Sequence, residues 1–112
     1  MAKSAGTKGL ILFDIDGCLF QGESWTEEDC LNAKPIPENI EKCNILASTG
    51  YIVILYTARR PHLREATEKA LYLSNVRYHA LRMDKCPASL YIDDKAIRPE
   101  ELDLKDPFKF IK

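Results

Sequence analysis

The sequence predicts a single α/β domain, a three-layer arrangement with a mostly parallel sheet of about four strands. Short apolar runs alternate along the chain with stretches of helical periodicity, and the connections between them are short. This alternation favours parallel strands joined by right-handed crossovers. A length of 112 residues fits one core, and 46% hydrophobic with 29% charged residues is an ordinary globular composition.

The first expected strand covers residues 9–14, an apolar run that ends abruptly in acidic residues and Gly17. Such a continuous run is typical of a strand buried on both faces. Residues 21–34 are polar and acidic, and Ser24 and Glu27 stand at capping-box spacing. This stretch is therefore expected to be a flap that contains a short helix.

A helix is expected to begin at Pro37 and to end at Gly50. Its apolar face is formed by residues at helical spacing, namely Ile36, Ile40, Cys43 and Ala47. The following residues 51–56 are apolar throughout and rich in β-branched side chains. They predict a buried central strand.

The second half repeats this pattern. Pro61 opens a second helix that stops at residues 74–75, and its buried stripe is Leu63, Ala66, Ala70 and Leu73. Residues 76–81 predict a third strand and residues 89–93 a short fourth strand. Residues 99–102 are expected to form one more helical turn.

Charge and segment length exclude several classes of protein. Sixteen Lys and Arg against seventeen Asp and Glu give a net charge of −1, which argues against charge-driven binding to nucleic acid or membranes. The apolar runs are too short to span a bilayer or to form a signal peptide. Four cysteines without a C-x-x-C pair predict reduced thiols, so we expect a cytoplasmic protein.

Polar side chains follow each expected strand. Asp14 and Asp16 come after the first, Thr57 after the second, Lys85 after the third, and Asp93–Asp94 after the fourth. Ligands of parallel sheets bind outside the carboxyl ends of the strands, so these side chains should meet at one edge. Clustered carboxylates would repel one another unless a hard divalent cation lay among them, which predicts Mg²⁺. A carboxylate nucleophile beside Mg²⁺, a hydroxyl and a lysine is what phosphoryl transfer through an aspartyl-phosphate requires.

These residues resemble the haloacid dehalogenase superfamily in its phosphatase branch, over nearly the whole chain. The matching motifs are Asp14-Ile-Asp16-Gly17, Tyr56-Thr57-Ala58-Arg59, Lys85 and Tyr91-Ile-Asp93-Asp94. The resemblance implies a Rossmann-like fold and a Mg²⁺-dependent phosphomonoester hydrolase acting on a small phosphorylated metabolite such as a sugar phosphate.

The resemblance also implies roles for individual residues. Asp14 would be the nucleophile and Asp16 the general acid and base, while Thr57 and Lys85 would complete the catalytic set. The substrate phosphate would contact Gly17, Thr57, Ala58, Arg59 and Lys85. The metal ligands would be Asp14, Asp16, Asp93 and Asp94.

Two departures from the family pattern concern the turns. Cys18 stands where Thr commonly follows the glycine, and Asp84 precedes Lys85 where the family has Gly. Asp84 is therefore expected to neutralise part of the charge of Lys85. Neither gap in the motif order has room for an inserted cap domain, so residues 1–112 should form one capless domain. Its open site would suit a large substrate, or a small one enclosed by a second copy of the chain.

Several alternatives stay open. Arg59, Arg60, His62 and Arg64 form either a set of substrate contacts or a solvated helix face. The runner-up function is a phosphatase of nucleic-acid ends or nucleotides. Less favoured are a phosphorylation-receiver domain, which would need an acceptor aspartate on a middle strand, and a non-catalytic phosphate-binding domain.

Overall fold

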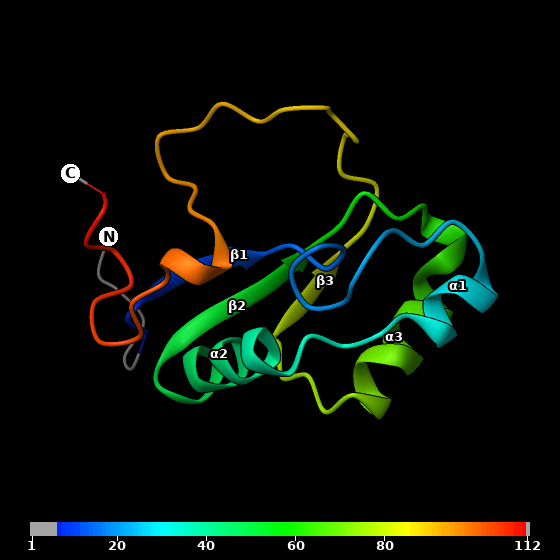
Figure 1. Ribbon diagram of the computed structural model, residues 1–112. Helices are drawn as coiled ribbons and strands as arrows, with labels where there is room; N and C mark the ends of the chain where they lie inside the picture. The colour runs from blue at the N-terminus through cyan, green and yellow to red at the C-terminus, as the bar shows by residue number, and fades with distance from the viewer. Residues whose placement is uncertain (1–6, 112) are drawn as a thin grey trace.

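The computed structural model describes residues 7–111, which form one parallel sheet with helices packed against it (Figure 1). The strands are β1 (Gly9–Phe13), β2 (Tyr51–Tyr56) and β3 (Ala80–Arg82), in the spatial order β1-β2-β3. The helices are α1 (Glu27–Asn32), α2 (Pro37–Ser48) and α3 (Arg64–Leu73), with short 3₁₀ turns η1 (Pro61–Leu63) and η2 (Pro99–Glu101). The predicted α/β class with a parallel sheet is confirmed.

The central strand β2 has the predicted limits, and its neighbour β1 ends one residue before the predicted end of residues 9–14. β2 pairs in parallel with β1 from Gly9 opposite Tyr51 to Phe13 opposite Leu55. β3 begins later and is shorter than expected from residues 76–81, since only Ala80–Arg82 join the ladder with β2. The sheet order proceeds in one direction, so crossovers of one hand place α2 and α3 on the same face of the sheet.

The helices begin near the predicted residues, with two differences in detail. The capping box of α1 is formed by Thr26 and Asp29 and not by the predicted pair two positions earlier. The stripe of α3 also differs, because Leu73 is 64% exposed whereas the polar Thr67 is fully buried. No helix between residues 7 and 111 is long and apolar enough to cross a membrane.

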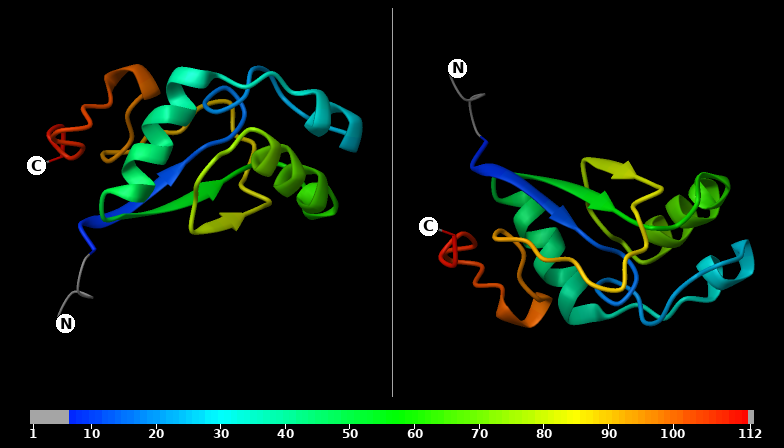
Figure 2. Two further views of the ribbon diagram at one scale, coloured as in Figure 1. Left: turned by 90° about the horizontal axis from the view of Figure 1, so that it is seen from below. Right: turned by 90° about the horizontal axis from the view of Figure 1, so that it is seen from above.

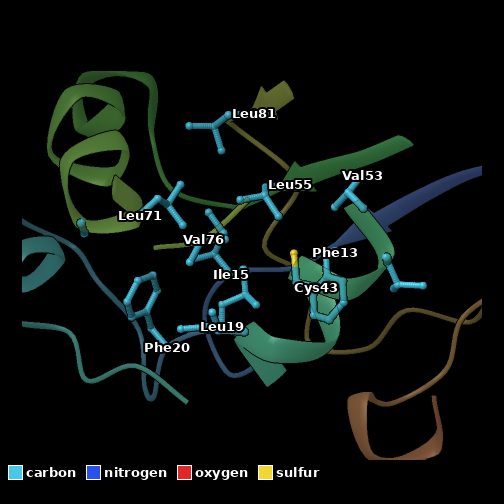
Figure 3. Packing of buried hydrophobic residues seen from close by; sticks show 13 residues of the cluster. Phe13, Ile15, Leu19, Phe20, Cys43, Val53, Leu55, Leu71, Val76 and Leu81 are labelled. Atoms are coloured by element: carbon cyan, nitrogen blue, oxygen red, sulfur yellow. The ribbon is translucent and has the colours of Figure 1, made fainter. Parts of the chain in front are cut away.

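The core lies between the helices and one face of the sheet (Figure 3). It contains alternate strand residues together with residues of α2 and α3: Phe13, Val53, Leu55, Leu81, Cys43, Leu46 and Leu71. The intervening residues Leu10 and Leu12 are 56% and 53% exposed. The expectation of a first strand buried on both faces is therefore wrong, and the described residues form two layers where three were predicted.

The predicted fourth strand is also absent from the structure. Residues 89–93 belong to a long exposed loop between β3 and η2, yellow to orange in Figure 1 and seen from two further sides in Figure 2. Leu90 is 73% and Ile92 93% exposed, so the apolar pattern that predicted a strand is not buried. The predicted helical turn over residues 99–102 is confirmed as η2.

Candidate functional site

The carboxyl ends of β1 and β2 meet the segment that follows β3. The backbone N–H of Thr57 donates to the carbonyl of Arg82, and the N–H of Lys85 donates to the carbonyl of Thr57, both at 2.9 Å. These two bonds continue the β2–β3 pairing beyond the strands and hold Lys85 next to the end of β2. Asp14 directly follows β1, the other neighbour of β2.

A tight turn after β1 presents the two aspartates. The carbonyl of Ile15 accepts hydrogen bonds from three successive N–H groups, those of residues 18, 19 and 20. Gly17 has φ of +79°, a conformation that side-chain-bearing residues adopt only with strain. Asn39 of α2 donates to the carbonyl of Cys18 at 2.8 Å and fixes the turn to the helix layer.

Asp14 is half-buried in this turn. Burial raises the pKa of its carboxyl above the ordinary value of 3.8, and the nearby charge of Asp16 adds to this rise. A hydrogen bond from the N–H of Ile15 at 2.7 Å and the positive charge of Lys85 act in the opposite direction on the pKa. A partly desolvated carboxylate beside a lysine is an environment suited to a nucleophile.

Asp16 is bound by Arg59. The Nε of Arg59 donates to one carboxylate oxygen at 3.0 Å and Nη2 donates to the other at 2.8 Å. The guanidinium is also held by the hydroxyls of Thr67 and Ser24, to which Nη1 and Nη2 donate at 3.0 and 3.2 Å. Arg59 thus lies at the centre of a buried polar network. The alternative that placed it on a solvated helix face is wrong.

Thr57 and Ala58 lie at the end of β2, as predicted. Thr57 is fully buried, and its Oγ1 accepts a hydrogen bond from the N–H of Arg59 at 3.2 Å. The hydroxyl therefore caps the turn that leads out of the strand. Capping uses a lone pair of Oγ1, so this bond does not engage the hydroxyl proton.

Lys85 forms no ion pair within residues 7–111. Its Nζ lies 4.4 Å from the ring centre of Tyr91 and 5.5 Å from that of Tyr56. The expected neutralisation by Asp84 does not occur, because Asp84 pairs with Arg60. The ammonium group of Lys85 is therefore available to an anion at the strand ends.

The metal ligands predicted from the sequence are not brought together. Asp93 and Asp94 lie in the exposed loop, where the Oδ1 of Asp93 accepts from the N–H of Lys95 at 2.8 Å. Within residues 7–111, no three His, Cys, Asp or Glu side chains are close enough to hold one metal ion. The residues as placed do not fit an assembled Mg²⁺ site, since Asp93 and Asp94 lie in the exposed loop and not beside Asp14.

Sequence reasoning missed the residues that support the site. Ser24 and Thr67 bind Arg59 from the flap and from α3, and both are buried. A signal for Thr67 was present, because it is a polar residue at a position that faces inward between Leu63 and Ala70. The sequence also assigned no basic neighbours to Tyr56, although Arg82 and Lys85 both lie over its ring.

Comparisons with known proteins identify the fold. No protein-family model matches this sequence, and no curated protein matches it significantly. Among solved structures, an MCSG target from Vibrio cholerae superimposes with a TM-score of 0.74 at 24% identity, covering 91% of this chain and 95% of that one.

Two structures of a Pnkp1/Rnl/Hen1 complex, one described as an RNA repair complex, also contain this fold. Their TM-scores are 0.63 and 0.62 at 21% and 19% identity. They cover 89% and 80% of this chain but only 35% and 30% of their own. Because the identities are 24% or lower, these similarities show only a shared fold, the α/β fold built on a parallel sheet.

Proposed function

We propose that this chain is a phosphatase of the haloacid dehalogenase type that hydrolyses phosphomonoesters through a phosphorylated Asp14. One observation carries the proposal: a half-buried carboxylate and an unpaired lysine share the carboxyl edge of a parallel sheet. Desolvation favours attack by the carboxylate, and the lysine attracts and neutralises the phosphate dianion. The motif resemblance assigns the same residues to the same roles.

The chemistry would occur in two displacements. First, a carboxylate oxygen of Asp14 attacks phosphorus, and the ester oxygen leaves with a proton from Asp16. A water molecule then attacks phosphorus, its proton passes to Asp16, and the bond to the Asp14 oxygen breaks to release inorganic phosphate. Arg59 occupies two of the four lone-pair directions of the Asp16 carboxylate, so the others can carry that proton.

Mg²⁺ enters this proposal through the motif resemblance and not through the geometry. When bound, the ion would neutralise charge on the phosphoryl oxygens. Turnover with Mg²⁺ and its loss in EDTA is the measurement that decides this part. Inorganic phosphate release that is equal in both conditions would remove the metal from the proposal.

The substrate is proposed to be a small phosphorylated metabolite, such as a sugar phosphate, that enters an uncapped site. The flap between β1 and α2 holds only the six-residue α1, which is too small to form a cap domain. Residues 58–85 are occupied by α3 and β3. The open edge would therefore leave much of the substrate exposed, unless a second copy of the chain covered it.

Phosphate release from a panel of sugar phosphates, nucleotides and phosphorylated oligonucleotides tests this function. Asp14→Asn should abolish turnover with every substrate, because an amide is not a nucleophile of this kind. Asp106→Asn, which alters an exposed acid outside the site, is the matched control and should retain wild-type rates. Turnover by Asp14→Asn that equals that of the control would exclude Asp14 as the nucleophile.

A second candidate is a phosphatase of nucleic-acid ends, and one cluster favours it. Beside the strand ends, Arg82 lies 5.7 Å from the ring centre of Tyr56, and Lys85 lies over both Tyr56 and Tyr91. Alternating aromatic and basic side chains bind single strands by stacking and charge. The fold is also that of chains in an RNA repair complex.

Two tyrosine variants separate these candidates. Tyr91→Leu should raise the KM for a phosphorylated oligonucleotide while leaving that for a sugar phosphate unchanged. Tyr72→Leu is the control, because Tyr72 is 80% exposed on α3 and lies outside the cluster. Equal KM values for the oligonucleotide in both variants would contradict the second candidate.

A further inference from the structure

Arg59 is a buried arginine whose side chain is 1% exposed. Each of its three guanidinium nitrogens donates a hydrogen bond to another side chain. The ring of Phe20 lies 6.0 Å from the guanidinium carbon and covers it further. A group in this position is not free to receive a substrate phosphate, because four of its five N–H bonds already donate to side chains and the side chain is closed to solvent.

The partners of Arg59 come from three separate segments. Asp16 belongs to the turn after β1, Ser24 to the flap, and Thr67 to α3. The planar guanidinium matches the carboxylate with two parallel hydrogen bonds, which fix the orientation of the carboxylate as well as its place. Two hydroxyls in turn fix the guanidinium, so the direction of Asp16 is set by the flap and the helix layer.

The neighbouring basic residues do not share this environment. Arg60 is exposed and pairs with Asp84, and Arg64 donates to the carbonyl of Leu81 at 3.0 Å. Of these three arginines, Arg59 is therefore the one that contacts Asp16, the predicted acid and base of the reaction. Arg60 and Arg64 are surface residues, whereas Arg59 lies inside the site.

We infer that Arg59 is a positioning residue, which orients the Asp16 carboxylate toward the leaving group and links that orientation to the flap through Ser24. This inference rests on the proposed phosphatase function and deepens it. Arg59 contributes by holding the proton donor in place and does not bind the substrate. A lysine would keep the positive charge but lose the paired geometry.

Leaving-group dependence is the readout that a merely structural role would not change. An alkyl phosphate needs a proton on its departing oxygen, whereas p-nitrophenyl phosphate has a good leaving group that departs without one. Arg59→Lys should therefore lower kcat/KM for the alkyl phosphate by roughly 10²-fold, the lower range for general acid catalysis, and change kcat/KM for the aryl phosphate little. The hydrolysis of phospho-Asp14, which also uses Asp16 and is common to both substrates, does not enter kcat/KM.

The dependence on Asp16 is tested by combining variants. Asp16→Asn should lower the ratio of alkyl to aryl kcat/KM by itself, and adding Arg59→Lys should not lower it further. Thr67→Val, which keeps the Asp16–Arg59 pair and removes one anchor, is the matched control for disturbance of the network. It should change the ratio less than Arg59→Lys does.

The outcomes separate the two levels of the proposal. No turnover by the wild type with any phosphate in the panel would overturn the phosphatase function, and the positioning role with it. Wild-type turnover with equal loss of kcat/KM for the alkyl and aryl phosphates in Arg59→Lys would overturn the positioning role alone. If Arg59→Lys does not fold, Ser24→Ala provides the test. The inference requires this variant to lower the ratio of alkyl to aryl kcat/KM by a smaller amount, and an unchanged ratio overturns it.

Discussion

The ion pair between Asp16 and Arg59 should dominate the stability of the site. Asp16→Asn keeps the shape of the side chain but removes its charge. The Arg59 side chain is 1% exposed and that of Asp16 17%, so the substitution leaves a guanidinium charge that water cannot reach. We expect the free energy of unfolding to fall by about 3 kcal/mol, the lower end for a broken buried pair, because Asn retains one acceptor.

Removal of Arg59, the other partner of the ion pair, should lower the free energy of unfolding by less. Arg59→Met fills a similar volume and leaves a carboxylate that water can partly reach, so its loss should be smaller than the roughly 3 kcal/mol of Asp16→Asn. The double variant removes both charges, and its loss should be clearly smaller than the sum of the two single losses. This non-additivity would measure the coupling between the two groups.

Urea unfolding followed by far-ultraviolet circular dichroism, in EDTA, is the assay. Asp103→Asn is the control, because its pair with Lys109 lies at the surface and should contribute little. A change in Asp16→Asn of under about 0.5 kcal/mol, the range of ordinary surface substitutions, would refute the buried pair. Additive losses in the double variant would refute the coupling.

Three further predictions concern single residues. Burial raises the pKa of Asp14, so the contribution of this carboxyl group to stability is complete below the ordinary pKa of 3.8 and is lost as the pH rises through the pKa of the folded state. Asp14→Asn in EDTA should therefore melt at a higher temperature than the wild type at pH 7, and a lower melting temperature would contradict this. Gly17→Ala should lower the free energy of unfolding, measured by thermal unfolding, by about 1 kcal/mol. The cause is the φ of +79° alone, since an added Cβ would have no atom within 4 Å, and an unchanged stability would show that the turn is relaxed. Iodoacetamide at pH 8 should alkylate the exposed Cys86 first and Cys18 slowly, because burial raises the pKa of Cys18 to about 11. Mass spectrometry measures the order of labelling, and faster labelling of Cys18 than of Cys86 would contradict this prediction.

Local patterns in the sequence determined most of the elements. The run of residues 51–56 is β2 to the residue, and Pro37 opens α2 because its fixed φ suits the first helical turn. The placement of the proposed catalytic residues was also predictable in part, since residues that directly follow parallel strands must lie at one edge of the sheet. Asp14, Thr57 and Lys85 are indeed held at that edge.

Patterns failed where burial depends on a partner distant in the chain. Leu10 and Leu12 look like residues of a strand covered on both sides, but which face of a sheet receives helices is decided by the direction of the crossovers. Residues 89–93 have the composition of a strand, yet a strand exists only where a neighbouring strand supplies its hydrogen bonds.

The sequence by itself determined most of the elements, their order and the residue types at the strand ends, because these depend on interactions between near neighbours. The tertiary structure alone decided the partner of each charge. Arg59 binds Asp16, and Asp84 binds Arg60 in place of the adjacent Lys85. Charged side chains are long and their partners come from different segments, so only the packed fold specifies which of them meet.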